Sequence, residues 1–263
     1  TTVQEKNITH PTDSKLYYKA IVKLNQAARS HGIQLRQSYT RVGKTMARQV
    51  ARYAHARHFK RMNRVLRKLR NRLGRVIRDV RRKAPKPSES LEELLLLCER
   101  LHAQERQDKK KLYSLHEPDV MCISKGKAHK RYEFGQKISV TTSNRGNWIL
   151  GVQLCAGNPY DGHTLTSALA DVELNTGIQV SDAYVDKGYR GHQHPGATRI
   201  HIAGSSNRNV TRTVKKRRRR RSAVEPLIGH LKSDTRMKRC FLKRSVGDAI
   251  NAILSAAGLN LQK

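Results

Sequence analysis

The spacing of hydrophobic residues divides the chain into a helical first half and a mixed second half. Residues 14–83 are expected to form two or three helices, because apolar side chains recur at helical spacing at Val65, Leu66, Leu69, Leu73, Val76 and Ile77. Thr12 or Asp13 can cap the first of these helices. After a Pro-containing linker at 84–88, a leucine-rich segment predicts a further helix over 90–114.

The second half alternates between strand and helix patterns. Segments 132–141 and 148–154 flank a turn at 144–147 and predict a β-hairpin. We then expect a helix over 162–175, capped by Asp161 and ending near Gly177. Strands at 178–185 and 198–202 and helices at 223–233 and 246–258 should follow. With the extended segment at residues 1–4, this order predicts an α/β domain with a mixed sheet and flanking helices.

The helical half lies between the first expected strand and the rest of the sheet. We therefore expect three parts: residues 1–13 as the remnant of a first strand, 14–115 as a basic helical insertion, and 116–263 as the remainder of the α/β domain. Residue 1 is Thr rather than Met, and it falls inside an apparent strand. The sequence is therefore expected to be an N-terminally incomplete fragment.

The charge balance points to nucleic acid. The formal net charge is +34, from 54 Lys and Arg against 20 Asp and Glu, and such a chain attracts polyanions. Between Arg36 and Lys83 there are 18 basic residues and one acid, Asp79. Like charges on adjacent turns destabilise a helix unless an anion neutralises them, so this region is expected to face DNA.

Cysteines and apolar runs exclude other classes of protein. The four cysteines lack CxxC pairs, so they predict neither a zinc framework nor a need for disulfides. The sequence has no signal peptide and no apolar run long enough to span a membrane. We expect a cytoplasmic, nucleoid-associated protein without a membrane partner.

Two carboxylates are candidates for chemistry. Glu225 follows a polycation and has Lys232 seven residues later on the same helix face; the cations are Lys215, Lys216, Arg217, Arg218, Arg219, Arg220 and Arg221. Asp186 ends the expected strand 178–185, where catalytic side chains project in α/β sheets. Each has an ordinary alternative: Glu225 as a capping acid and Asp186 as a turn residue.

Taken together, these residues resemble the DDE transposases of bacterial insertion sequences, in the IS-four/IS-five-like superfamily. The segments that carry the resemblance are 1–8, 11–13, 132–135, 158–163, 184–189 and 221–225. The family's terminal signature is Tyr, two residues, Arg, three residues, Glu, six residues and Lys. Arg221, Glu225 and Lys232 fit this spacing, whereas Arg218 stands at the Tyr position.

The resemblance implies a ribonuclease H-like catalytic domain in which three carboxylates bind two divalent ions, typically Mg²⁺. It implies that Asp186 and Glu225 are the second and third of these catalytic metal ligands, and that Arg221 and Lys232 contact phosphate. The implied reaction is cleavage and strand transfer of double-stranded DNA at terminal inverted repeats. Because transposition usually needs two DNA ends held together, a homodimer in a synaptic complex is one expectation.

The family's first carboxylate would lie just before residues 1–3, and this residue is not in the sequence. Asp13 lies beyond a proline and a helix start, and Asp161 is expected to cap a helix. We therefore expect that these 263 residues alone do not cleave DNA. Two alternatives stay open: a non-enzymatic nucleic-acid binder with structural carboxylates, and another ribonuclease H-like nuclease such as a resolvase.

Overall fold

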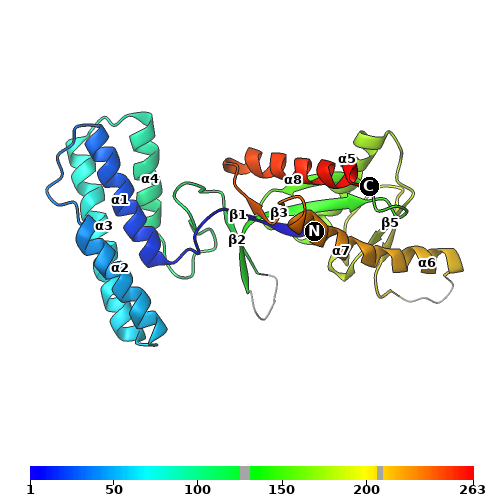
Figure 1. Ribbon diagram of the computed structural model, residues 1–263, viewed down its shortest axis with the longest axis horizontal. Coiled ribbons are helices and arrows are strands. Elements are labelled where there is room, and N and C mark those ends of the chain that lie inside the picture. The colour runs from blue at the N-terminus through cyan, green and yellow to red at the C-terminus, as the bar shows by residue number, and fades with distance from the viewer. Residues whose placement is uncertain (125–130, 206–209) are drawn as a thin grey trace. The chain divides into compact units, whose positions relative to one another are not determined.

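A computed structural model describes residues 1–124, 131–205 and 210–263. The chain forms two compact units. One, which we call the sheet unit, combines Thr1–Asn7 with Met121–Lys263, and the other, the helical unit, is Ile8–Val120. Figure 1 labels the elements of both units.

The helical unit consists of four helices: α1 (Asp13–Ser30), α2 (Thr40–His55), α3 (Phe59–Lys83) and α4 (Glu89–Ala103). Two or three helices were expected over residues 14–83, and three are present over residues 13–83. The expectation of a helix reaching residue 114 was wrong, because α4 ends at Ala103. Gln104 leaves helical geometry with ψ 134°, and its side chain accepts a hydrogen bond of 2.6 Å from the Leu112 backbone, which returns the chain to the core.

The core of the helical unit is an apolar stripe on α3. Leu69, Leu73 and Val80 are fully buried there, in one cluster with Leu24 of α1 and Leu95 of α4. On the α4 side, Arg81 forms ion pairs with Glu92 and Glu99 of α4. The apolar face of α3 therefore packs the helices together, whereas most cations of α3 are exposed to solvent.

The sheet unit contains the remaining elements. Its strands are β1 (Thr2–Lys6), β2 (Met121–Ser124), β3 (Tyr132–Thr142), β4 (Ile149–Cys155), β5 (Asp182–Val185), β6 (Arg199–Ile202) and β7 (Arg239–Cys240). Its α-helices are α5 (Leu165–Thr176), α6 (Arg212–Arg220), α7 (Val224–Ser233) and α8 (Arg244–Leu261). Short 3-10 turns are η1 (Asp161–Thr164), η2 (Lys187–Tyr189) and η3 (Arg221–Ala223).

The strands form a mixed sheet and a separate parallel pair. β1 lies between β3, which is antiparallel to it, and β7, which is parallel to it. β2 and β4 both pair with β3, and β5 pairs with β6 in parallel. This arrangement confirms the predicted hairpin and the predicted α/β class, a mixed sheet with flanking helices that is consistent with a ribonuclease H-like fold.

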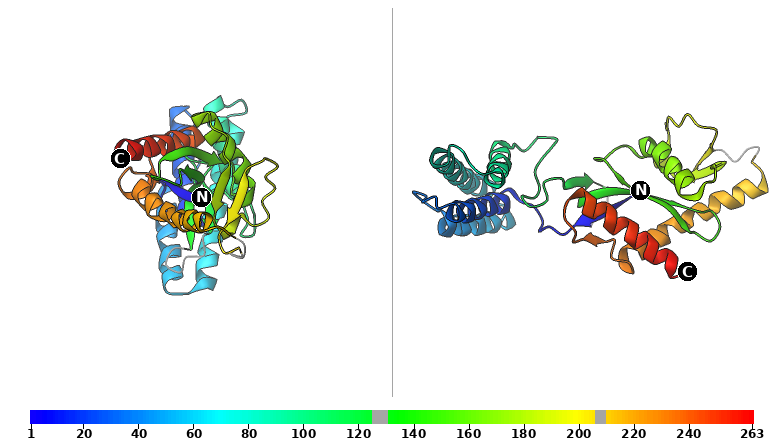
Figure 2. Two further views of the ribbon diagram at one scale, coloured as in Figure 1. Left: turned by 90° about the vertical axis from the view of Figure 1, so that its right-hand side faces the viewer. Right: turned by 90° about the horizontal axis from the view of Figure 1, so that it is seen from above.

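Helices cover both faces of β4. Val152 packs on the cluster formed by α7 and α8, which includes Leu231 and Leu259. On the other face, Gln153 donates a hydrogen bond of 2.8 Å to the Ser167 carbonyl of α5. Alternate residues of a strand point to opposite faces, and Figure 2 shows α5 (yellow-green) and α8 (red) on opposite sides of the strands.

A buried polar network joins β1 to α8. Lys6 Nζ lies 3.0 Å from Asp248 Oδ1, and the two side chains are only 2% and 3% exposed. Gln4 Nε2 donates to the Asp248 carbonyl at 2.9 Å, and Asn251 donates to Gln4 Oε1 at 2.8 Å. A buried pair of this kind is costly to break because one charge would be left without its partner.

Two local predictions need correction, and one element was not predicted. β5 begins at Asp182 rather than at residue 178. The basic run that precedes Glu225, for which no element was predicted, lies mostly in the helix α6. Asp161 does not cap α5, whose N-cap residue is Thr164. Gly177 does end that helix, with a positive φ of 67°. Within the described ranges, no helix is long and apolar enough to cross a membrane.

The close approach of β1 and β3 makes Gly135 a critical position. A Cβ atom there would lie 1.9 Å from the Gln4 carbonyl oxygen, so Gly135→Ala should lower the free energy of unfolding by about 3 kcal/mol. Urea unfolding followed by fluorescence of the single tryptophan, Trp148, reports on the sheet unit. Gly229→Ala on α7 is the control: a Cβ there meets nothing within 4 Å, and the change should add about 1 kcal/mol. Equal effects of the two substitutions would contradict this account.

Candidate functional site

A cavity of about 310 Å³ in the sheet unit contains some of the candidate residues. It is lined from β3, β4, α5, β5 and the turn η3, and its polar lining includes Thr1, Asp182, Asp186, Tyr189, Arg220 and Arg221. Asp186 and two cations of the basic run therefore share one cavity, although they are far apart in sequence.

Asp186 is fixed where β5 ends. Its side chain caps the turn η2, since Oδ1 accepts a hydrogen bond of 2.9 Å from the Gly188 backbone. A Cβ atom at Gly188 would lie 3.1 Å from Asp186 Oδ1 and 3.1 Å from Asp161 Oδ2. Gly188 thus lies between two carboxylates, and a larger residue would crowd both of them.

Asp161, expected as a helix cap, instead lies beside Gly188, opposite Asp186. Its Oδ1 lies 2.5 Å from Lys137 Nζ and accepts a hydrogen bond of 2.9 Å from the Thr1 hydroxyl. Burial opposes ionisation, but the hydrogen bonds from Lys137 and Thr1 lower the pKa of Asp161 below its usual range. Asp161 is therefore a charged group whose charge Lys137 already balances.

Asp186 differs from Asp161 in this respect. Among the described residues, no cation forms an ion pair with Asp186, which uses one oxygen for a backbone amide. Nearby, burial raises the pKa of Tyr189 to about 12, so its phenol stays protonated at neutral pH. The cavity therefore offers one carboxylate without a paired cation beside a neutral phenol.

Glu225 lies in the first turn of α7 but outside the lining of this cavity. Its side chain is 77% exposed, and Oε1 lies 4.0 Å from Arg221 Nη2. Its neighbour Val224 and the paired Arg221 do line the cavity. Lys232 is half-buried in the last turn of the same helix. The structure thus brings Arg221 to Asp186 and leaves the Glu225 carboxylate in solvent next to the cavity.

The basic run forms an exposed helix. α6 begins at the cap residue Thr211, whose side chain accepts a hydrogen bond from the Val214 backbone, and no residue of α6 is buried. Lys215, Lys216, Arg219 and Arg220 are exposed. A helix with adjacent like charges is not stable by itself, so its contacts with the rest of the sheet unit matter.

Asp182 provides such a contact and was not expected from the sequence. Its carboxylate lies 2.8 Å from His201 Nε2 on β6, 3.3 Å from Arg199 and 3.8 Å from Arg217 of α6. The hydrogen bond with His201 lowers the pKa of Asp182, against the opposing effect of burial. Asp182, which lines the cavity, therefore links β5, β6 and α6.

Sequence reasoning had only a weak signal for these additional groups. Asp161 falls in the segment 158–163 that carries part of the resemblance, and Asp182 precedes Asp186 by four residues on one strand. Nothing in the sequence distinguishes Lys137 from the other cations, because its role depends on the register of β3 against β4 and β1.

The described residues do not supply a complete metal site. In the ranges 1–124, 131–205 and 210–263, no three His, Cys, Asp or Glu side chains are grouped to hold an ion. Asp161 and Asp186 flank Gly188, but Lys137 repels a cation at Asp161. The cavity offers the Asp186 carboxylate to a cation and the Arg220 and Arg221 side chains to phosphate oxygens.

The comparison with protein families covers more than half of the chain. A family model described as "Transposase DDE domain" matches residues 104–261. A protein of Rhizobium meliloti, "Uncharacterized protein ORF8 in nfe locus", is 61% identical over 59 residues, which are 22% of this chain and 28% of that protein. The chain therefore spans less than a third of that relative's length. No solved structure matches the chain.

The role of Asp182 can be tested by Asp182→Asn. This change should reduce the free energy of unfolding of the sheet unit by about 1 kcal/mol at neutral pH, because its two arginine partners, Arg199 and Arg217, are 75% and 45% exposed and solvent weakens both ion pairs. The pKa of Asp182 is lowered in the folded state, so its contribution is present above the ordinary carboxyl pKa of about 3.9 and is lost as the pH falls through the folded value.

Urea unfolding of the native and Asp182→Asn chains, followed by Trp148 fluorescence, should therefore show a difference that disappears in acid. Asp234→Asn, which removes an exposed pair with His230, is the control and should change little. A difference that persists at low pH would mean that the Asp182 charge is not its cause.

Proposed function

The chain belongs to the family of proteins with a transposase DDE domain, and from this premise we propose that it serves insertion-sequence transposition through metal-dependent cleavage and strand transfer of double-stranded DNA. Within that family we place it in the IS-four/IS-five-like superfamily. Its substrates would be the terminal inverted repeats of the element. We further propose that two copies hold the two ends in a synaptic complex.

The observation that carries this proposal is the cavity that joins Asp186 to Arg220 and Arg221. A carboxylate without a paired cation is suited to a divalent ion, and guanidinium groups are suited to phosphate oxygens. Phosphoryl transfer on DNA needs both groups at one place. The cavity lies at the end of β5, where α/β sheets present their functional side chains.

We assign the individual roles as follows. Asp186 and Glu225 are the two metal-binding carboxylates of this chain, and Arg221 and Lys232 contact phosphate beside them. Lys215, Lys216, Arg217, Arg218, Arg219 and Arg220 bind the DNA backbone along α6. Because the Glu225 side chain is exposed, it would turn toward the cavity only when DNA and metal are bound.

DDE transposases typically use divalent metal ions, and Mg²⁺ suits sites built from oxygen ligands and phosphate. Two carboxylates from this chain are not a full set for two ions, and Asp161 is balanced by Lys137. We propose that a third carboxylate belongs immediately before Thr1, which lines the same cavity as Asp186. The 263 residues alone would then bind DNA without cleaving it.

A second candidate function is non-enzymatic DNA binding. The exposed position of Glu225 and the balanced charge of Asp161 favour it. In that case Asp186 would have only its structural role as the cap of η2. A third candidate, a ribonuclease H-like nuclease such as a resolvase, would cleave DNA but would not join the cut end to a target.

The proposed missing carboxylate gives a direct test. The chain extended by Met-Asp ahead of Thr1 should nick supercoiled plasmid carrying inverted repeats when Mg²⁺ is present, whereas the 263-residue chain should not. Met-Asn ahead of Thr1 is the matched control and should be inactive. Asp186→Asn in the extended chain should lower nicking by about 100-fold or more, with DNA binding retained.

Each outcome separates the candidates. Nicking by the 263-residue chain would refute the missing carboxylate. DNA binding without nicking in every version would favour the non-enzymatic binder. Nicking by the extended chain without transfer of the cut end into a second plasmid would favour a simple nuclease.

The contribution of α6 can be measured through salt dependence. Lys215, Lys216, Arg219 and Arg220 are all exposed, and replacing the four with Gln should make the slope of log affinity against log salt shallower by about 2 to 4. Arg219→Lys with Arg220→Lys preserves the charge and is the control. Fluorescence anisotropy with labelled duplex DNA gives both slopes. An unchanged slope in the Gln variant would mean that α6 does not contact phosphate.

A further inference from the structure

One face of α3 in the helical unit collects arginines around a single acid. Arg75, Arg78, Asp79 and Arg82 are spaced at i, i+3, i+4 and i+7, which places them on one side of a helix. Asp79 is buried, whereas the three arginines are exposed. This face is distinct from the one that carries Arg81, whose guanidinium pairs with acids of α4.

The segment between α1 and α2 is held over this face by Asp79. The Arg36 backbone amide donates to Asp79 Oδ2 at 2.8 Å, and Arg82 Nη2 lies 2.5 Å from Asp79 Oδ1. Lys83 reaches both Asp79 and the Gln34 carbonyl. Although burial opposes ionisation, these contacts lower the pKa of Asp79, which therefore remains an anion. Its charge holds the loop and is balanced by Arg82 and Lys83.

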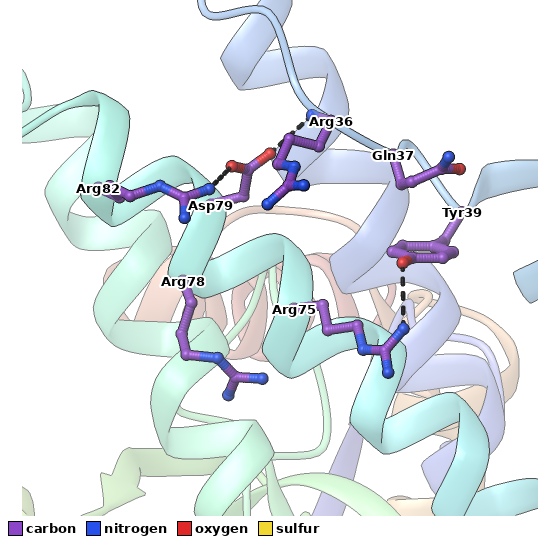
Figure 3. A pocket seen from close by; sticks show the side chains of 7 residues that line it. All are labelled: Arg36, Gln37, Tyr39, Arg75, Arg78, Asp79 and Arg82. Carbon is purple, nitrogen blue, oxygen red and sulfur yellow. Dashed lines mark hydrogen bonds and ion pairs between the residues drawn. The ribbon is translucent and has the colours of Figure 1, made fainter.

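The loop and helix enclose a cavity of about 560 Å³, lined by Arg36, Gln37, Tyr39, Arg75, Arg78, Asp79 and Arg82. Figure 3 shows Arg36 reaching in from the loop, with Arg75 and Arg78 extending from α3 beside it. In the part of the chain that the structure describes, no carboxylate forms an ion pair with Arg36, Arg75 or Arg78. Three guanidinium groups therefore border one opening without a protein anion to balance them.

Tyr39 fixes two of the arginines on the other side of the cavity. Arg75 Nη1 donates to the Tyr39 hydroxyl at 3.4 Å, and the Arg72 guanidinium lies 4.8 Å from the centre of the Tyr39 ring. Tyr39 has a positive φ of 51°, an unusual conformation for an aromatic residue. Strained residues of this kind concentrate at binding sites, where the surrounding structure holds them in place.

We propose that this arginine pocket, formed by Arg36, Arg75 and Arg78, is a second DNA site that binds a backbone phosphate through guanidinium forks. The planar guanidinium matches phosphate oxygens in a two-point geometry, and a phosphate supplies the negative charge that the pocket lacks. The choice of DNA as the source of the phosphate rests on the proposed function. The pocket lies wholly within the helical unit, away from Asp186 and α6 in the sequence.

The test compares two variants of the full chain with equal loss of charge. Arg36→Gln, Arg75→Gln and Arg78→Gln empty the pocket of its guanidinium groups, whereas Lys86→Gln, Lys109→Gln and Lys110→Gln remove three exposed cations of the same unit outside it. Binding of labelled duplex DNA is measured over a range of salt concentrations. Circular dichroism before binding shows that both variants retain their helices.

The pocket variant should bind DNA about 10- to 100-fold more weakly near 0.1 M salt, with a slope shallower by about 2 to 3. The control variant should keep nearly the native slope. Replacing the same three arginines with Lys should preserve most of the slope but weaken binding, because Lys lacks the fork. Equal losses in the pocket and control variants would overturn the proposal, since only overall charge would then matter.

Two further results would also overturn it. One is an unchanged slope in the pocket variant. The other concerns ATP: the native chain binds ATP tightly, the pocket variant does not, and the pocket variant keeps the native salt slope with DNA. A free polyphosphate, rather than DNA, would then occupy the pocket. The nicking assay separates this proposal from the proposed function. If the chain extended by Met-Asp does not cleave DNA either, but replacing the pocket arginines makes the salt slope shallower, the DNA site is supported and the proposed transposase reaction is refuted.

Discussion

The sheet unit depends on β1, a strand that the chain forms before entering the helical unit and that pairs with β3 after leaving it. Because β1 lies between β3 and β7, its loss would divide the sheet. Gly135 permits the close approach to Gln4, and the buried Lys6–Asp248 pair joins β1 to α8. Thr1, at the start of this strand, lines the cavity that contains Asp186. The pairing of β1 with β3 therefore holds the sheet together and also positions the candidate site.

Three acids of this strongly basic chain lie at structural junctions. Asp248 holds β1 to α8, Asp182 links β5 and β6 to α6, and Asp79 holds the loop before α2 onto α3. Each of these acids forms ion pairs with nearby cations, and those cations therefore have a structural role. Among the described residues, Lys215, Lys216, Arg219 and Arg220 of α6 and the pocket residues Arg36, Arg75 and Arg78 form no ion pair with an acid. Because the chain has 54 basic and only 20 acidic residues, most of its cations cannot pair with an acid. Such cations are informative where several of them lie on one face.

Regular elements were predictable from the sequence because their pattern is local. Apolar spacing at 65–77 predicted α3, a cap at Thr12 or Asp13 predicted the start of α1, and the turn at 144–147 predicted the hairpin of β3 and β4. The end of α4 was missed because it depends on a side-chain contact between Gln104 and the Leu112 backbone. The helix α6 was missed because its residues repel one another, and only contacts such as Asp182–Arg217 hold it. The role of Asp161 was missed because its partners, Thr1 and Lys137, are distant in sequence.

The two carboxylates on either side of Gly188 show that a carboxylate's suitability as a metal ligand depends on its ion pairs as well as on its position. Asp161 and Asp186 lie against the same glycine, although the sequence predicts a helix cap for Asp161 and a metal ligand for Asp186. Lys137 lies 2.5 Å from Asp161 and would repel a divalent ion there, whereas Asp186 has one hydrogen bond from a backbone amide and no ion pair among the described residues. An ion that needs negative oxygen ligands would therefore favour Asp186 over Asp161. For Asp161 to become a ligand, Lys137 would first have to move away, and the register of β3 against β1 and β4 holds it in place.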